Sequence, residues 1–300
     1  NGVIWVATNV GLYRIKEGAH LEAELVFNEI TVEGSNGRSY FRNFRTIYED
    51  GKKRLWLCTD DAIVLMQSAS KDGNRLKVLR TYFNQKGLVN KVNQRFQAVL
   101  EFAPGVFWVG TKYNGIKIIN ENTGEVSSLN TDDSPIANLA NQDVRSLKKA
   151  DDGSIWIGTF NGLYLYRNGK ILFIQADDNN PNSLSNNSIR PIFQDKRGSI
   201  WIGTYFGGIN IYDKDIPNFQ NFTHQSRRNS LSYNVVSAFL EHPNGELVIG
   251  TEGGGLNYFN RHTSSFFNER HDKSNVGSLS HNNVKSICRD REGNLWVGTY

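Results

Sequence analysis

Basic residues recur at one position of short apolar segments, where they could bind an anion. Each follows an apolar residue that lies twelve positions before a tryptophan-containing tetrapeptide, as Arg190 follows Ile189. Guanidinium groups match the geometry of carboxylate and sulfate, so one interpretation is a ring of cations that gathers anionic ligands. The alternative is that each cation pairs with a neighbouring carbonyl or turn acid, since buried cations are normally paired. The four cations are Arg45, Arg145, Arg190 and Lys285, and Gln97 and Ser237 hold two further equivalent positions.

Aromatic and polar residues that directly follow the same tetrapeptide form a second candidate site. Aromatic rings can stack on the apolar C–H faces of sugars while a few polar groups fix the orientation of the ligand. These positions differ from copy to copy, which indicates that they are free of the repeat's structural demands. The alternative is that they only cover the ends of the strands. The predicted ligand-binding residues are Lys112, Tyr113, Phe160, Tyr205, Phe206 and Glu252.

Motifs for catalysis or metal binding are missing from the sequence. It contains no Gly-x-Ser-x-Gly, His-Glu-x-x-His or phosphate-binding Gly-x-x-x-x-Gly-Lys pattern. The six histidines have no metal-ligand spacing, and residues 177–182 look like a calcium loop but lack its glycine and closing glutamate. A glycosidase needs two placed carboxylates, which one sequence does not reveal. We therefore expect no catalytic residue, no metal and no cofactor in this segment.

The composition is that of a folded, turn-rich protein. The chain has 300 residues, a net charge of +4, 38% hydrophobic residues, 28 glycines and one methionine, which excludes global disorder and favours turns over long helices. Charges of both signs are interleaved, so nucleic acid is not an expected partner. Apolar runs are too short to span a membrane, and Cys58 and Cys288 are too few for a disulfide framework.

One tetrapeptide of the type Trp-Ile-Gly-Thr returns seven times along the chain, and we call its first residue the anchor. Successive anchors lie between 45 and 52 residues apart, which is the range expected of four-stranded propeller blades. Within each copy an apolar strand, a polar turn and the anchor strand form a β-hairpin, followed by a third and usually a fourth strand. The anchors are Trp5, Trp56, Trp108, Trp156, Trp201, Val248 and Trp296.

The repeat predicts an all-β fold, a β-propeller of four-stranded blades that spans residues 1–300. Six first strands, seven second strands and six third strands are recognisable, so we expect seven blades in the intact protein and at least one incomplete terminal blade here. The first residues have no initiator methionine, basic segment or cleavage site, which indicates a piece of a longer chain. An acid at the start of the turn, Asp50, Asp195 or Asp290, is expected to accept backbone N–H bonds across it.

The unit that combines an apolar strand, Asp-x-x-Gly, Trp-Ile-Gly-Thr, Gly-Leu-Tyr and Asn-Ser-Leu-Ser resembles the two-component regulator propeller repeat. That repeat occurs in the extracytoplasmic sensor region of hybrid two-component histidine kinases. The resemblance covers the whole chain and is strongest in copies four, five and seven, as in residues 286–299. Copies two, three and six depart from it, with Lys53 at the turn-glycine position, Ala103-Pro104 in place of the acidic turn, and Val248 in place of tryptophan.

The resemblance implies a non-enzymatic, ligand-sensing propeller in the periplasm, as the extracytoplasmic part of an inner-membrane protein. It implies an oligosaccharide or other small ligand, and as partners a further propeller, a β-sandwich and the kinase domains of the same chain, with a homodimer as a further possibility. No membrane contact is expected of this segment. A propeller enzyme acting on polysaccharide and a protein-interaction scaffold are the alternatives. Paired acids facing one pocket would favour the enzyme, and a featureless face would favour the scaffold.

Overall fold

The computed structural model describes residues 4–16, 22–27, 29–31, 38–40, 43–60, 62–68, 76–83, 95–129, 139–178, 180, 182–213, 216–225 and 229–300. The elements bounded within these residues are all β-strands, β1 to β27, which confirms the all-β prediction. The chain divides into two compact units, residues 1–147 and residues 148–300. Each unit is described by itself, and the extent of one propeller domain over residues 1–300 stays a prediction.

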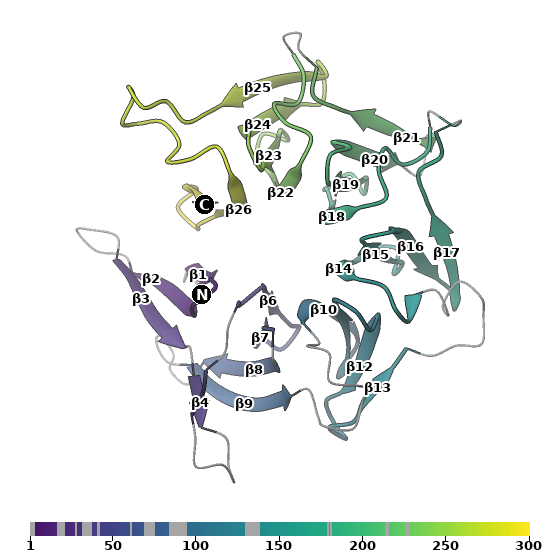
Figure 1. Ribbon diagram of the computed structural model, residues 1–300, viewed down its shortest axis with the longest axis vertical. Coiled ribbons are helices and arrows are strands. Elements are labelled where there is room, and N and C mark those ends of the chain that lie inside the picture. Colours follow the sequence, from purple (N-terminus) through teal and green to yellow (C-terminus); the bar gives the residue numbers. More distant parts are fainter. Residues whose placement is uncertain are drawn as a thin grey trace. The chain divides into compact units, whose positions relative to one another are not determined.

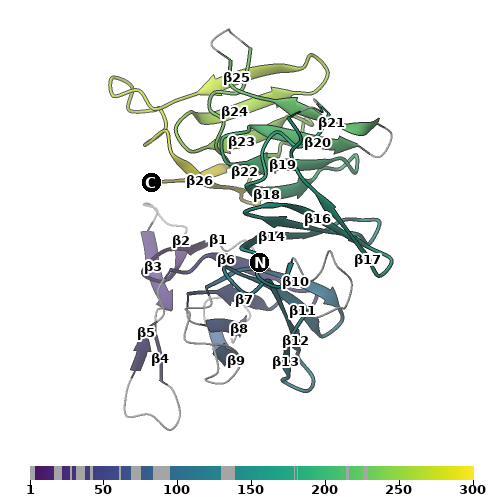
Figure 2. The ribbon, with the colours of Figure 1, turned by 45° about the vertical axis from the view of Figure 1, so that its right-hand side comes forward.

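Unit 1 contains two described four-stranded antiparallel sheets whose strands follow one another in sequence order (Figure 1). A three-stranded sheet and a two-stranded hairpin, visible in Figure 2, precede them. The three-stranded sheet is β1 (Ile4–Ala7), β2 (Leu12–Lys16) and β3 (Glu22–Phe27), and the hairpin is β4 (Glu29–Thr31) and β5 (Arg38–Tyr40). The four-stranded sheets are β6 (Thr46–Glu49), β7 (Leu55–Cys58), β8 (Ala62–Ser68) and β9 (Leu76–Phe83), then β10 (Phe96–Ala103), β11 (Val106–Thr111), β12 (Ile116–Asn120) and β13 (Val126–Ser128).

Unit 2 repeats the same sheet three times and ends with a two-stranded pair. The first sheet is β14 (Val144–Lys149), which begins just before the unit boundary, β15 (Ile155–Thr159), β16 (Gly162–Arg167) and β17 (Lys170–Ile174). The next two are β18 (Ile189–Gln194), β19 (Ile200–Thr204), β20 (Ile209–Asp213) and β21 (Ile216–Phe222), then β22 (Val236–Glu241), β23 (Leu247–Thr251), β24 (Gly255–Asn260) and β25 (Ser265–Glu269). The pair is β26 (Val284–Arg289) and β27 (Leu295–Thr299).

In the four-stranded sheets the anchor strands are the second strands, and four of them are buried on both faces. Every residue of β7, β15, β19 and β23 is buried, because the tryptophan and glycine point to one face and the branched residue and threonine to the other. Trp56, Trp156 and Trp201 are almost fully buried. Trp5 and Trp296, which lie in the three-stranded sheet and the final pair, are only partly buried.

The glycine of the anchor tetrapeptide allows the next sheet to approach closely. A Cβ atom on Gly203 would lie 2.8 Å from Cγ1 of Val236, and one on Gly250 would lie 2.7 Å from Cγ1 of Val284. Both valines are the apolar residues that begin the following first strand. The glycine and the apolar residue recur together because they form one contact between neighbouring sheets.

We expect Gly203→Ala to lower the free energy of unfolding by about 1–3 kcal/mol, the usual cost of overpacking a core. The added methyl group would also meet the ring of Pro191 at 2.9 Å. Urea denaturation followed by circular dichroism measures the effect. Gly277→Ala is the control, because its Cβ would meet only Asn275 Oδ1 at 3.4 Å. A Gly203→Ala variant as stable as this control would contradict the packing described here.

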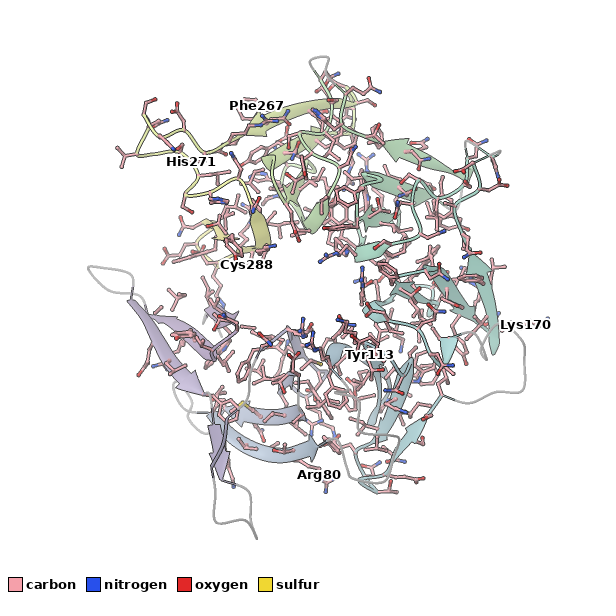
Figure 3. The ribbon with its side chains drawn as sticks, viewed as in Figure 1. Arg80, Tyr113, Lys170, Phe267, His271 and Cys288 are labelled. Atoms are coloured by element: carbon pink, nitrogen blue, oxygen red, sulfur yellow. The ribbon has the colours of Figure 1, made fainter. Side chains whose placement is uncertain are left out.

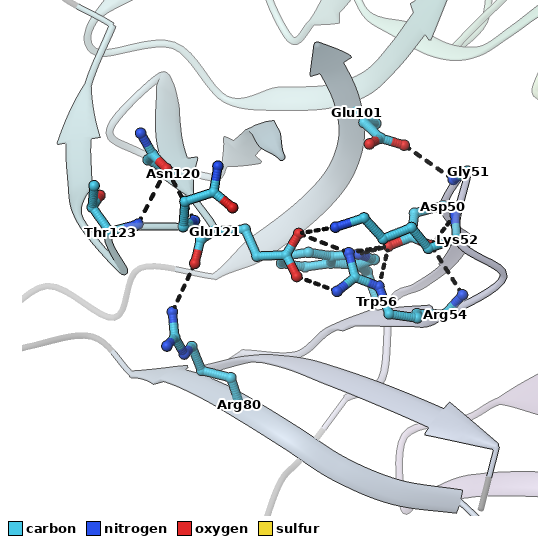
Figure 4. A network of polar contacts seen from close by, with 11 residues as sticks. Asp50, Gly51, Lys52, Arg54, Trp56, Arg80, Glu101, Asn120, Glu121 and Thr123 are labelled. Carbon is cyan, nitrogen blue, oxygen red and sulfur yellow. Dashed lines mark hydrogen bonds and ion pairs between the residues drawn. The ribbon is translucent and has the colours of Figure 1, made fainter. Parts of the chain in front are cut away.

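The acid of the turn holds both the turn and the anchor tryptophan, as the network around Asp50 shows (Figure 4). The expected backbone bonds are present: Asp50 accepts N–H bonds from Lys52 and Arg54, and Asp195 accepts them from Arg197 and Ser199. The carboxylate also accepts the indole N–H of the anchor, which the sequence analysis did not foresee. The distances are 2.9 Å for Trp56 to Asp50, 2.7 Å for Trp201 to Asp195 and 2.8 Å for Trp296 to Asp290.

Candidate functional site

Two residues of the predicted cation position, Arg190 and Lys285, lie in β-bulges at the start of their first strands. In β18 the pairing with β19 shifts after Ile189, and in β26 the pairing with β27 shifts after Val284. Arg190 and Lys285 fall within these shifts, so neither has a pairing partner in the ladder. A bulge re-aims the side chain of its extra residue. The sequence analysis predicted that these cations lie on the first strand. Because of the bulge, their side chains need not follow the regular alternation between the two faces of the strand.

The residue after each anchor threonine lies beside the start of the first strand of its own sheet. The backbone N–H of Tyr205 donates to Ser188 O at 2.9 Å, and that of Glu252 donates to Val235 O at 2.9 Å. Tyr300 makes the equivalent bond to Asn283 O at 3.1 Å. The two predicted sets, loop residues and first-strand cations, are therefore neighbours in every sheet that has this bond.

In unit 2 these neighbours form one connected group, which we call the Glu252 cluster: Arg190, Tyr205, Phe206, Glu252 and Lys285. Glu252 Oε1 lies 3.7 Å from a terminal guanidinium nitrogen of Arg190, and Glu252 Oε2 lies 3.1 Å from Nζ of Lys285. The Arg190 guanidinium lies 5.0 Å from the ring centroid of Tyr205. The rings of Tyr205 and Phe206 meet edge to face at 4.3 Å. Residues from three consecutive sheets thus meet around one carboxylate.

Phe206 presents its ring to solvent from a strained backbone. Its φ is 73°, an outlier for a bulky residue, and such a conformation costs about 1–3 kcal/mol. The ring nevertheless stays 58% exposed. Strain of this kind persists where the surrounding structure enforces it and is concentrated at ligand-binding sites. Phe206 is therefore a candidate platform for a ligand.

The cluster combines two cations and one carboxylate with exposed aromatic surface. The side chains of Arg190 and Lys285 are 39% and 44% exposed, so both keep donors for a ligand. The charges of the three ionic groups sum to one positive charge. An arrangement of this kind can hydrogen-bond hydroxyl groups, attract an acidic group and stack on an apolar ring face.

The other predicted site residues lie elsewhere. In unit 1, Arg45 Nε lies 2.6 Å from Asp60 Oδ1, and Arg145 Nε lies 3.0 Å from Asp143 Oδ2. The residues Lys112 and Tyr113, the latter labelled in Figure 3, contact each other, with Nζ 5.1 Å from the ring centroid. Phe160 is an exposed ring in the turn between β15 and β16 of unit 2.

All four predicted cations therefore face carboxylates: Asp60, Asp143 and, for two of them, Glu252. The four charges are therefore paired, although none of these carboxylates is the turn acid that the alternative named.

The sequence analysis missed Tyr300, which lies beside the cluster. Nζ of Lys285 is 5.8 Å from its ring centroid. Tyr300 follows the anchor threonine, as Tyr205 and Glu252 do, so the repeat alignment contains the signal that places it. Among the described residues, no group of three or more His, Cys, Asp or Glu side chains is arranged to hold a metal ion. In that same part of the chain, no helix is long and apolar enough to cross a membrane.

Three segments match a family model described as the two component regulator propeller: residues 138–161, 183–206 and 278–300. These segments are two-component regulator propeller repeats. They contain the pairs β14–β15, β18–β19 and β26–β27. Two of these segments contain Arg190, Tyr205, Phe206 and Lys285. Four of the five residues of the Glu252 cluster therefore belong to the matched repeats.

Solved structures give the same fold class. The WD40 β-propeller domain of Doa1 matches with a TM-score of 0.64 and 14% identity, covering 99% of this chain and 86% of that one. The extracellular domain of a putative hybrid two component system from B. thetaiotaomicron matches with a TM-score of 0.50 and 19% identity, covering 99% of this chain and 44% of that one. A second such domain from B. thetaiotaomicron matches with a TM-score of 0.43 and 26% identity, and the match covers 100% of this chain and 42% of that one.

The chain thus spans less than half the length of those extracellular domains, and at these identities the likeness to the first two structures shows the β-propeller fold. No curated protein matches the chain.

Proposed function

We propose that this chain is a non-enzymatic, ligand-sensing propeller of a hybrid two-component sensor, located outside the cytoplasm, and that it binds an oligosaccharide at the Glu252 cluster. The observation that carries the proposal is the strained, exposed Phe206 ring beside Tyr205, Arg190 and Glu252. The propeller repeats and the likeness to extracellular domains of hybrid two component systems support the sensor class. The net positive charge of the cluster favours acidic oligosaccharides.

The proposal includes the surroundings of the chain. The intact protein would carry a seven-bladed propeller, together with a further propeller, a sandwich and a histidine kinase domain. It would lie in the periplasm as part of an inner-membrane protein and could act as a dimer. Ligand binding would shift how these parts pack, which requires different affinities for the ligand in the two signalling states.

The cluster supports binding rather than hydrolysis. Glu252 is its carboxylate, and both of its oxygens face cations. A retaining or inverting glycosidase uses two carboxyl groups about 5–9.5 Å apart, one of them protonated. The cluster contains Glu252 as its one carboxyl group, so it lacks the second carboxyl group that this chemistry needs.

Calorimetric titration with a panel of acidic and neutral oligosaccharides tests the proposal. We expect Tyr205→Ala to weaken binding about tenfold, because it removes one stacking platform and the ring partner of Arg190. Phe267→Ala is the control, since it removes an exposed aromatic ring on β25, outside the cluster (Figure 3). Thermal melts check that each variant folds.

Other outcomes would move or remove the site. Binding that survives Tyr205→Ala and Lys112→Ala but is lost in Arg145→Ala, with stability intact, would place the ligand at the cations of unit 1. Absence of binding by the wild type to every sugar in the panel would overturn oligosaccharide recognition by this chain.

A further inference from the structure

Five of the turns between first and second strands share one backbone hydrogen-bond pattern, but not all of them begin with an aspartate. The first turn residue donates its N–H to the carbonyl four residues ahead, as Asp50 does to Arg54 O at 3.0 Å, Asp195 to Ser199 O at 3.1 Å and Ala150 to Ser154 O at 2.8 Å, and as His242 and Asp290 also do. In each of the five its carbonyl also accepts an N–H from three residues ahead, at 2.8–3.3 Å. Ala150 therefore occupies the position of the turn aspartate in an unchanged turn.

The missing carboxylate leaves two donors without an acceptor. Asp195 accepts the N–H groups of Arg197 and Ser199 and the indole N–H of Trp201. In the Ala150 turn the counterpart of Ser199, Ser154, donates its N–H to Asp152 instead. The equivalent donors beside Ala150 are the backbone N–H of Asp152 and the indole N–H of Trp156, and neither has a hydrogen-bond acceptor among the residues that the structure describes. The tryptophan is nevertheless only 2% exposed. Its indole nitrogen is not among the buried side-chain atoms that lack a partner, and Asp152 is an exposed residue, so an acceptor from outside the chain can reach both donors.

A pocket of about 280 Å³ lies at this position, between the turns of two neighbouring sheets of unit 2. Its walls include the side chains of Ala150, Trp156, Arg167, Lys196, Arg197 and Tyr212. Beside Asp195 the corresponding space is filled by protein, because the guanidinium of Arg261 lies 5.2 Å from the ring centroid of Trp201 and 3.1 Å from the aspartate. The space beside Trp156 is therefore open where the space beside Trp201 is occupied.

The charge around the pocket suits an anion. Lys196 and Arg197 are exposed cations of its wall, and neither forms an ion pair within the described part of the chain. The acidic Asp152 is already engaged by Arg167 and by Ser154. Three cations face two carboxylates, Asp151 and Asp152, on the lining. The net charge of the lining side chains is therefore one positive charge, and it lies close to the unpaired N–H groups of Asp152 and Trp156.

We propose that this pocket binds an organic carboxylate of about monosaccharide size, whose carboxylate group takes the place of the missing turn aspartate. One carboxylate oxygen accepts the indole N–H of Trp156, the other accepts the N–H of Asp152, and Lys196 and Arg197 supply the countercharge. The site lies at the opposite ends of the first and second strands from the Glu252 cluster. It does not depend on the proposed function.

Nuclear magnetic resonance of the indole N–H groups tests the proposal, with sodium glucuronate and sodium acetate as probes at constant ionic strength. The Trp156 signal, assigned with Trp156→Phe, is expected to shift with either carboxylate at millimolar concentration and to stay in place with glucose. An equal shift with glucose, or none with glucuronate, would overturn the proposal. Tyr205→Ala should leave this signal unchanged, which separates this result from the test of the Glu252 cluster.

Ala150→Asp provides the decisive variant. It restores the carboxylate that the sister turns carry, so we expect it to abolish the glucuronate shift and to raise the melting temperature. The double variant Lys196→Ala, Arg197→Ala should weaken binding at least threefold, whereas Lys273→Ala, which removes an exposed cation elsewhere in unit 2, should not. An Ala150→Asp protein that binds glucuronate as the wild type does would refute the assignment.

Discussion

Trp201→Ala is expected to lower the free energy of unfolding by about 3–5 kcal/mol, the usual cost of truncating a buried large aromatic residue. The ring is 2% exposed and packs within 5.8 Å of the Phe259 ring and 6.3 Å of the Phe239 ring, measured between centroids. Its loss also removes the donor to Asp195 and the aromatic face beneath Arg261. Urea denaturation followed by far-ultraviolet circular dichroism measures the change.

Two controls isolate the anchor contribution. Phe267→Ala removes an aromatic ring that is 67% exposed, so its effect should stay within about 0.5 kcal/mol. Trp201→Phe keeps most of the apolar volume but loses the N–H, so its cost should lie between those of the other two variants. A loss below 1 kcal/mol for Trp201→Ala, about the average for any point mutation, would mean that the anchor does not hold the sheets together.

The fold could be predicted because each repeated residue serves a contact that every sheet needs. Trp201 needs Asp195 for its N–H, and Gly203 must stay small to admit Val236. Contacts of this kind recur in several copies and are visible as a fixed spacing of the residues that make them. Departures are absorbed locally: Lys53, at the turn-glycine position, adopts a φ of 61° without changing the pairing of β6 with β7.

The candidate site could be predicted only in part, because it depends on what differs between copies. The repeat places Arg190, Glu252 and Lys285 at known positions, but these residues lie in three different copies. Which side chains reach one another depends on bulges and rotamers rather than on spacing. The positive φ of Phe206 cannot be predicted from the sequence. The absence of a carboxylate at Ala150 is visible there, but its consequence appears only once Trp156 is seen to lack an acceptor.

Asp50 is the centre of the most extensive polar network described in unit 1 (Figure 4). Its side chain is fully buried and bonds the indole of Trp56 at 2.9 Å and Nε of Arg54 at 2.8 Å. Arg54 in turn bonds both carboxylate oxygens of Glu121, which also lies 3.2 Å from Nζ of Lys52. Glu121 follows β12, so the network joins two neighbouring sheets.

Asp50→Ala is expected to lower the free energy of unfolding at neutral pH by about 3–5 kcal/mol, the range for removing one partner of a buried ion pair. The variant leaves the indole N–H of Trp56 and two turn N–H groups without their acceptor. Chemical denaturation of both proteins measures the difference. Asp178→Ala, which removes an exposed carboxylate, is the control and should be close to neutral. Equal stability of Asp50→Ala and this control would contradict the role given to the network.

The same network predicts how stability depends on pH. Burial alone raises the pKa of Asp50, but hydrogen bonds from Trp56 and Arg54 outweigh it and hold that pKa below its ordinary value. The bonds from Arg54 likewise lower the pKa of Glu121. Carboxyl groups with depressed pKa values stabilise the folded state above their unfolded pKa, about 4, and this contribution is lost as the pH falls below it.

The stability difference between wild type and Asp50→Ala should therefore be largest at neutral pH and shrink as the pH falls below about 4. In the wild type, protonation removes the charge that Arg54 and Trp56 stabilise, whereas the variant has no such charge to lose. Denaturation curves of both proteins across this range measure the difference. A gap that stayed constant down to the lowest pH would show that the carboxylate acts through its shape and packing and not through its charge.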